Sequence, residues 1–101
     1  MTIQNSIDSR KISEYLMLPM VIRHRKIDNE MVYTGFIPGM TEIDIIEKDF
    51  SLCKKQLKSK TRLLVVDYIE NNRNFPFFPT KEELLEDFED IVSISFIKIP
   101  C

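Results

Sequence analysis

The sequence has few of the residues that turn a backbone sharply or bind a metal. Its 101 residues contain only two glycines and one histidine, and no tryptophan. Glycine reaches positive φ without steric cost, so left-handed turns are restricted to few places, and both glycines lie in one hexapeptide, GFIPGM (residues 35–40). The single histidine, His24, has no second imidazole with which to form a zinc site. There is no glycine-rich phosphate loop. These absences argue against a metal- or nucleotide-dependent enzyme.

Long apolar runs are also missing. No segment approaches the roughly 18 apolar residues that span a bilayer, and the first 16 residues are polar, unlike a signal peptide. The two cysteines, Cys53 and Cys101, lie too far apart in the chain for a C-x-x-C pair and do not indicate a disulfide framework. The net charge of −2 gives no basic excess for general nucleic-acid affinity. We therefore predict a cytoplasmic protein that does not bind membranes.

The composition that remains is that of one folded domain. Hydrophobic residues make up 44% of the chain, which is enough for one modest core. We expect a disordered stretch over residues 1–8 and a single domain over residues 9–101. The N-terminal part of this domain, DSRKISEYLML, has apolar residues at helical spacing and precedes Pro19. Since the residue before a proline avoids the helical region, we predict a short helix that ends there.

Three alternating segments follow. Residues 20–27 and 30–37 read as strands joined by a tight Asp28–Asn29 turn, and residues 40–47 read as a third strand. The hexapeptide forms the corner between the second and third strands. There Gly35 permits a close approach, Pro38 fixes φ, and Gly39 suits the positive φ of a type II turn. The pattern predicts a three-stranded antiparallel meander.

The second half changes period. From about residue 48 to 72, apolar residues recur at helical spacing and predict one long helix, with Ile69 part of its apolar stripe. The segment FPFFP (residues 75–79) is predicted to be an extended cover that buries its three phenylalanines. Thr80 and Glu83 have capping-box spacing before a short helix with Leu84, Leu85 and Phe88 inward. The last strand, residues 91–99, must rejoin the meander. The fold class is thus α+β, with the order α-β-β-β-α-α-β.

No catalytic constellation is present in the sequence. His24 is the only histidine and lies between cations, and Cys53 lies on the apolar stripe of the long helix, as an inert buried thiol would. Asp44, Glu47 and Asp49 are explained by strand alternation and by the helix start. We predict that the protein is not an enzyme, and that it uses no cofactor and no metal.

Two segments carry opposite charge. Residues 48–62 contain six cations and one anion, whereas residues 81–90 contain six anions and one cation. One interpretation is two solvated helix faces that attract each other. Another is that the acidic segment binds a basic partner through complementary potentials, for example a protein that itself binds RNA.

The residues resemble one known family. The stretch SEYLMLPMVIRHRKIDNEMVYTGFIPGM (residues 13–40) resembles the opening of HicB-type antitoxins, in which an EYL-x-LPY element leads into a β-hairpin that ends in an LPGC corner. The matching positions are Glu14, Tyr15, Leu16, Leu18 and Pro19, with Met20 in place of tyrosine, and then Ile37, Pro38 and Gly39, with Met40 in place of cysteine. The proline segment of the family resembles residues 75–79. Phe36 replaces an acidic residue, and no glycine precedes the long helix.

The resemblance implies a partial RNase H-like fold without nuclease activity. Such proteins bind a small HicA-type toxin, an mRNA-cleaving ribonuclease, and cover its catalytic surface. Because the chain stops after its last strand, we expect a diverged member that lacks the family's C-terminal DNA-binding domain and does not bind DNA alone. The residues expected at the partner are Glu82, Glu83, Glu86, Asp87, Glu89, Asp90, Phe36, Ile37 and Met40.

Three alternatives remain open. The chain could be a small regulatory nucleic-acid-binding protein that uses Arg23, Arg25, Lys54, Lys55 and Lys58. It could inhibit a protein partner other than a HicA-type toxin. It could be a degenerate RNase H-like enzyme that depends on Asp44 or Asp49. We also expect a homo-oligomer, a dimer or larger, because the meander leaves unpaired sheet edges and because the family commonly dimerises; the sequence does not say which edge.

Overall fold

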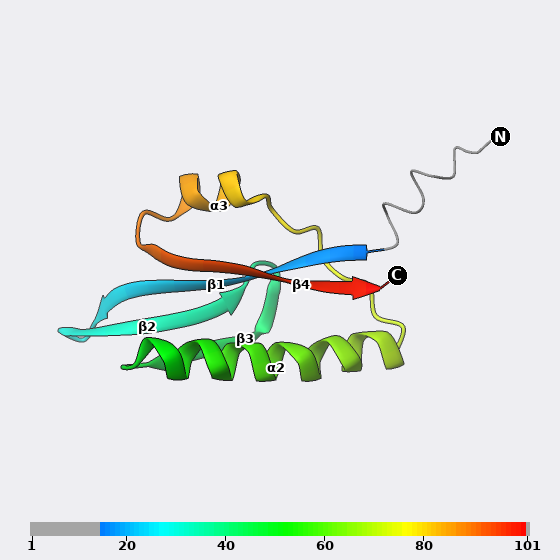
Figure 1. Cartoon of the computed structure of the whole chain (residues 1–101), viewed down its shortest axis with the longest axis horizontal. Coiled ribbons are helices and arrows are strands. Elements are labelled where there is room, and N and C mark those ends of the chain that lie inside the picture. The colour runs from blue at the N-terminus through cyan, green and yellow to red at the C-terminus, as the bar shows by residue number, and fades with distance from the viewer. Residues whose placement is uncertain (1–14, 101) are drawn as a thin grey trace.

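The computed structural model describes residues 15–100, which form one antiparallel sheet with a helix on each face (Figure 1). The strands follow the order β3-β2-β1-β4 across the sheet. The elements are β1 (Tyr15–Ile27), β2 (Glu30–Ile37), β3 (Met40–Glu47), α2 (Phe50–Glu70), α3 (Lys81–Asp87) and β4 (Ile91–Pro100). The predicted α+β class, the meander, the long helix, the short helix and the returning last strand are confirmed.

The two predicted turns of the meander have the backbone that their residues favour. Asp28 and Asn29, between β1 and β2, both have positive φ, 51° and 66°, as a type I′ hairpin turn requires. Gly39, between β2 and β3, has φ 84° after Pro38, as in a type II turn. Tight turns therefore fix the register of the first three strands.

The predicted N-terminal helix is wrong where the structure can test it. Residues from Tyr15 onward belong to β1, which runs through Pro19, while residues 9–14 and the expected disordered stretch 1–8 lie outside the described residues. Pro19 lies opposite Phe96 of β4, but the ladder between β1 and β2 begins only at Val21. Proline has no backbone N–H to donate, so it fits poorly in a strand that is hydrogen-bonded on both sides. At Pro19, β1 has a partner strand on one side only. Pairing with β4 overrides the local helical pattern.

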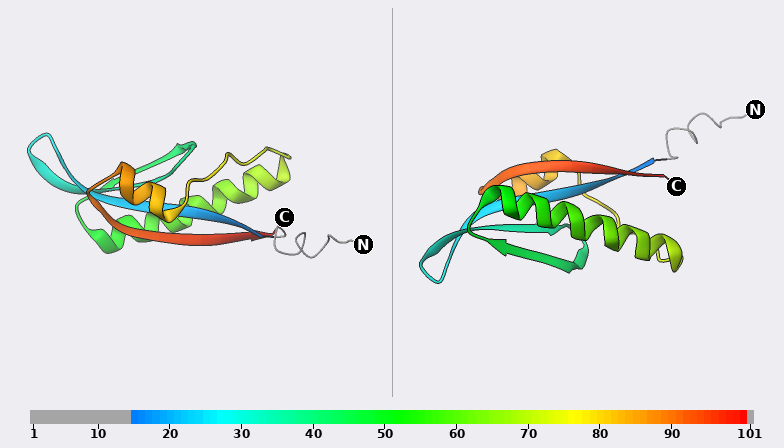
Figure 2. Two further views of the ribbon diagram at one scale, coloured as in Figure 1. Left: turned by 90° about the horizontal axis from the view of Figure 1, so that it is seen from above. Right: turned by 60° about the horizontal axis from the view of Figure 1, so that its bottom comes forward.

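The main core lies between the sheet and α2. Asp49 caps this helix, with its side chain accepting a hydrogen bond from the Leu52 backbone N–H (2.8 Å). A Cβ on Gly35 would lie 3.1 Å from Leu57 Cδ2 and 3.3 Å from Cys53 Sγ, so the missing side chain lets α2 approach β2 closely. The buried cluster is Leu18, Met20, Ile22, Ile37, Met40, Ile43, Ile45, Cys53, Leu57, Tyr68 and Ile99. Figure 2 shows α2 lying along the length of the sheet.

The segment after α2 turns back across the end of the sheet. Arg73 lies over the Tyr68 ring (4.0 Å) and forms ion pairs with Glu42 (2.7 Å) and Asp67 (2.8 Å). Phe75 stacks on Tyr68 with ring centroids 4.9 Å apart. These contacts lead the extended segment from α2 toward α3, on the opposite face of the sheet.

Several residues expected in the core are exposed. Phe77 is 97% exposed, so the prediction that all three phenylalanines of the FPFFP segment are buried is wrong, although Phe75 and Phe78 do pack against the core. Leu85 on α3 and Ile69 on α2 also face away from the sheet. On β4, Val92 and Phe96 are about half-exposed, because α3 covers only part of that face. Alternation identified the strand but not how much of it is covered.

Candidate binding groove

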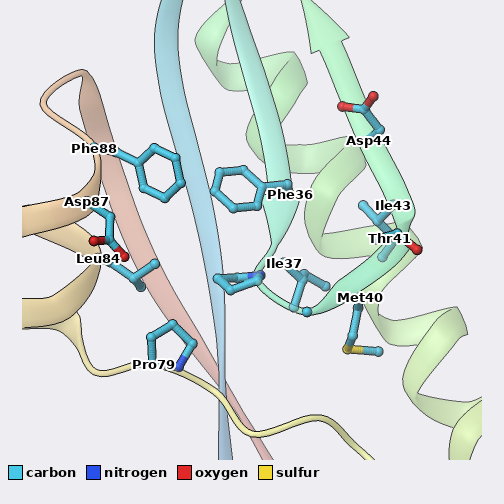
Figure 3. Close-up of a pocket in the computed structure, with 12 residues that line it drawn as sticks. Phe36, Ile37, Met40, Thr41, Ile43, Asp44, Pro79, Leu84, Asp87 and Phe88 are labelled. Carbon is cyan, nitrogen blue, oxygen red and sulfur yellow. The ribbon is translucent and has the colours of Figure 1, made fainter.

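A groove lies between α3 and the corner that joins β2 to β3 (Figure 3). We call it the corner groove, and its volume is about 530 Å³. It is lined by Phe36, Ile37, Pro38, Gly39, Met40, Thr41, Ile43, Asp44, Pro79, Leu84, Asp87 and Phe88. Two segments at least 35 residues apart in the chain therefore form one surface.

A capping box fixes the start of α3 at one wall of the groove. The Thr80 hydroxyl accepts a hydrogen bond from the Glu83 backbone N–H (3.1 Å), and the Thr80 backbone N–H donates to the Glu83 carboxylate (2.8 Å). Both groups would otherwise be unpaired at a helix N-terminus. Because α3 has only seven residues, these two hydrogen bonds contribute much of what keeps this segment helical. The predicted capping box is confirmed.

Apolar contacts hold α3 on the sheet. Leu84 is buried, and the Phe88 ring meets the Phe36 ring edge to face, with centroids 5.6 Å apart (Figure 3). Such aromatic pairs contribute about 0.5–1.5 kcal/mol beyond the area that they bury. Leu84 and Phe88 are four residues apart, so they lie on one side of the helix turn. The helix is thus anchored by two side chains.

An ion pair fixes the end of α3 to the sheet. Arg23 on β1 donates from both Nε (2.7 Å) and Nη2 (3.1 Å) to the two carboxylate oxygens of Asp90, and its guanidinium lies 4.4 Å from the Phe88 ring centroid. The His24 backbone N–H also donates to the Asp90 carbonyl (3.0 Å). Hydrogen bonds from Arg23 hold the pKa of the Asp90 carboxyl below its usual range. Asp90 is therefore already bound within the chain and is not a free contact for a partner.

The groove combines an apolar floor with an acidic rim. Ile37 and Met40 are buried beneath it, while Asp44 from β3 and Asp87 from α3 lie on its two sides (Figure 3). Neither aspartate forms an ion pair with any described residue. An apolar centre with a charged rim is the usual anatomy of a protein-binding surface.

The expected partner residues fall into three groups in the structure. Phe36, Ile37, Met40 and Asp87 line the corner groove. Asp90 is paired with Arg23. The remaining expected residues are exposed on α3 or just after it, outside the groove lining, and are Glu82, Glu83, Glu86 and Glu89. The structure therefore brings the acidic segment and the corner together, but with only one of the acidic side chains in the groove.

Sequence reasoning missed part of the groove. Asp44 was explained by strand alternation and considered otherwise only for a degenerate RNase H-like enzyme, yet it forms the rim on the β3 side. Leu84 and Phe88 were expected to be inward, and their spacing at i and i+4 was the signal that they face the sheet together. What the sequence did not reveal is that the Phe88 ring meets Phe36, since that contact depends on how the segment before α3 crosses the sheet.

The residues considered for catalysis can each be placed in the structure. His24 stacks on Tyr33, with centroids 4.3 Å apart and ring planes at 8°. Cys53 is buried, and burial raises the pKa of its thiol, which disfavours a nucleophilic thiolate. Within residues 15–100, no three His, Cys, Asp or Glu side chains gather as a metal site would require, Asp44, Glu47 and Asp49 included.

The two charged segments do not meet. α2, with its lysines, lies on one face of the sheet, and the acidic α3 lies on the other, so the interpretation that their faces attract each other within the chain is wrong (Figure 1). The sheet also separates the basic residues that the nucleic-acid-binding alternative would use. Arg23 packs against Phe88 on the α3 side, whereas Lys54 and Lys58 line a second groove between α2 and β4. They do not form one continuous basic surface with Arg23.

No helix in the described part of the chain is both long and apolar enough to cross a membrane. Comparison of the chain with protein-family models, with curated proteins and with solved structures found no match. The functional argument therefore rests on the residues and on the geometry of the corner groove.

Proposed function

We propose that this chain is a HicB-like inhibitor that binds a small, basic, HicA-type mRNA-cleaving toxin in the cytoplasm. One observation supports the proposal most directly. Asp87 of the acidic segment and the Pro-Gly corner, both expected at the partner, lie on the two sides of one groove. In this proposal the order β-β-β-α-α-β corresponds to the partial RNase H-like fold of the family.

The groove suits a partner that presents cations around an apolar side chain. Asp44 and Asp87 lie on opposite sides of the groove with Phe36 between them, so a partner can present cations to the two carboxylates and an apolar group to Phe36 (Figure 3). Complementary charge at the rim speeds association and selects partners, whereas the apolar centre supplies most of the affinity. Inhibition then requires only that the partner's active surface is covered. It requires no chemistry by this chain.

The experiment expresses this chain together with the small protein encoded beside it and measures co-purification and relief of toxicity. Asp87→Lys is the test variant, because a cation at the end of α3 does not oppose the helix dipole. Glu70→Lys, an exposed change at the end of α2, is the matched control. We expect Asp87→Lys to weaken binding at least about tenfold, which corresponds to about 1.4 kcal/mol, and Glu70→Lys to leave it unchanged.

Two results would contradict this proposal. The first is that the neighbouring protein neither co-purifies nor loses toxicity. The second is that the chain alone binds RNA with an affinity that falls steeply as salt rises, which is the signature of phosphate contacts. That second result would favour a nucleic-acid-binding role for the lysines of α2.

A further inference from the structure

A second groove lies between α2 and the edge strand β4, on the face of the sheet opposite α3. We call it the α2–β4 groove, and its volume is about 440 Å³. Buried Met20, Ile22 and Leu57 form its floor. Gly35 lets α2 lie close over β2, and Ser95 on the outer strand is left only half-buried. The groove is therefore the space that α2 does not fill beside β4.

The charges along the helix side of the α2–β4 groove have one sign. Lys54, Lys58 and Arg62 line it at intervals of four residues, so they form one row along α2. All three are exposed, and none forms an ion pair with any described residue, although Lys54 lies 6.0 Å from the Phe50 ring centroid. No acidic side chain is among the described residues that line the groove. Like charges four residues apart on a helix repel one another, so an anionic ligand beside the row would relieve that repulsion.

The strand side of the groove presents main-chain hydrogen-bonding groups. In the described sheet β4 pairs with β1 on one side only, and an edge strand presents the N–H and C=O of every second residue outward. Ser95 lies opposite Met20 of the core and so points toward α2, whereas Ile94 and Phe96 point to the other face. Phe96 is 40% exposed there. The edge thus has a polar, cationic side and an apolar side.

We propose that the α2–β4 groove binds an extended acidic segment of a partner protein, which adds to the sheet as a strand beside β4. The acidic side chains of this segment face the row on α2. The side chains between them are apolar and lie beside Ile94 and Phe96 on the other face. Addition of a strand to a free sheet edge is a recurring mode of peptide recognition, in which the main chain gives affinity and alternate side chains give specificity.

The spacing of the cations matches such a strand. Lys54 and Arg62 are about 12 Å apart along the helix axis, at a rise of 1.5 Å per residue. Three side chains on one face of a strand span about 13 Å. α2 and β4 run in the same direction along the sheet (Figure 2). Three acidic residues at alternate positions can therefore each meet one cation, whereas a contiguous acidic run would direct charge toward the apolar side of the edge.

This inference does not rest on the proposed function. The α2–β4 groove shares no lining residue with the corner groove and lies on the opposite face of the sheet. The corner groove has an acidic rim and suits a basic partner, so the two grooves select partner segments of opposite charge.

The first test uses two labelled synthetic peptides of equal composition, TEVEVEVT with alternating glutamates and TVVEEEVT with contiguous ones, and measures binding by fluorescence anisotropy. We expect the alternating peptide to bind at least about tenfold more tightly than the contiguous one, and Lys58→Glu to weaken its binding at least about tenfold. Lys60→Glu is the matched control, because it makes the same charge change on an exposed position of α2 outside the groove. We expect it to leave binding unchanged, and circular dichroism verifies that both variants fold.

Three results of this test would overturn the proposal. They are no binding of the alternating peptide, equal affinity for the two peptides, and equal loss of affinity in the two variants. Competition with an octamer of uridylate separates carboxylate from phosphate recognition. We expect the unlabelled peptide to displace the label at a lower concentration than the octamer does, and the reverse order would identify a phosphate-binding surface instead.

The second test asks whether the peptide pairs with β4 through its main chain. In a strand, the backbone N–H groups of the glutamates all point to one edge and those of the valines to the other. We therefore compare the alternating peptide N-methylated at its glutamates with the same peptide N-methylated at its valines. We expect only one of the two to lose binding, and which one loses it gives the direction of the added strand. Equal binding of both, or equal loss in both, would refute strand addition.

Discussion

The face of the sheet under α2 is covered by a helix of 21 residues, whereas the opposite face is covered by the seven residues of α3 and the extended segment before it. Under α2 the packing is continuous, and at Gly35 there is no room for even one more carbon atom without movement. Under α3 one buried leucine, one aromatic pair and one ion pair hold the helix. The corner groove remains open beside them.

Under the proposed function, this difference separates the part of the molecule that supplies stability from the part that binds. Close packing on the α2 face supplies the apolar burial that keeps the sheet folded. The α3 face is held at a few points, so it can leave Phe36, Asp44 and Asp87 accessible to a partner without loss of the fold. Binding surfaces commonly lie on such thinly held elements placed on a rigid scaffold.

The largest expected effect comes from a matched pair of leucines, one on each face. Leu57 and Leu84 are both 1% exposed. Leu57→Ala leaves a cavity in continuous packing, and we expect it to lower the free energy of unfolding by about 4 kcal/mol. Leu84→Ala borders the open groove, where neighbours and water can fill the space, and we expect about 2 kcal/mol. Urea denaturation measures both.

Hydrogen exchange distinguishes the two leucine variants further. Leu84→Ala is expected to raise exchange in α3 while the amides of β1 and β2 keep their protection. Leu57→Ala is expected to lower protection throughout the sheet, since the shared core is weakened. Equal losses of stability with the same exchange pattern would contradict the distinction between the faces.

The second effect tests the close approach of α2 to the sheet. The Cβ of Gly35→Ala meets Leu57 Cδ2 at 3.1 Å and Cys53 Sγ at 3.3 Å, so we expect a loss of about 1–2 kcal/mol from overpacking. In a Leu57→Ala background the nearest atom is absent, and the same change is expected to cost less. A double-mutant cycle by urea denaturation measures this coupling. Additive costs would show that the contact with Leu57 does not limit the space at Gly35.

Sequence patterns predicted local features of the fold well, and features that depend on distant partners less well. The Asp28–Asn29 turn, the Gly39 corner and the Thr80 capping box follow from residues next to one another, and all three are confirmed. Pro19 was misread because its place in a strand depends on β4, almost 80 residues later. Local helical spacing there could not reveal that partner.

The candidate groove was predictable in its parts but not in its assembly. The sequence indicated the acidic segment and the corner that contains Phe36, and the structure brings the two together. The sequence did not indicate that Asp90 forms an ion pair with Arg23, because that contact joins residues 67 positions apart. Nor did it indicate that Phe77 would be exposed, since burial in an extended segment depends on which side chains happen to face the sheet.

The smallest effect concerns the ion pair that fixes α3. Hydrogen bonds from Arg23 hold the pKa of Asp90 below its ordinary value, so the ionised form stabilises the folded state. That stabilisation is present above the unfolded-state pKa, about 4, and is lost as the pH falls through the lower folded-state pKa. Since the Asp90 side chain is 34% exposed, we expect Asp90→Asn to cost only about 0.5 kcal/mol at pH 7.

The pH dependence distinguishes this ion pair from a packing effect. The difference in unfolding free energy between the natural chain and Asp90→Asn is expected to shrink as the pH falls from 5 toward 2, because protonation removes the same charge that the substitution removes. In an Arg23→Met background, Asp90→Asn is expected to change little at either pH. A difference that stays constant from pH 7 to pH 2 would mean that Asp90 acts through its shape and backbone contact with His24. In that case the attachment of α3 to the sheet would not depend on the charge of Asp90. Acid would then weaken it no more than it weakens the apolar packing under α2.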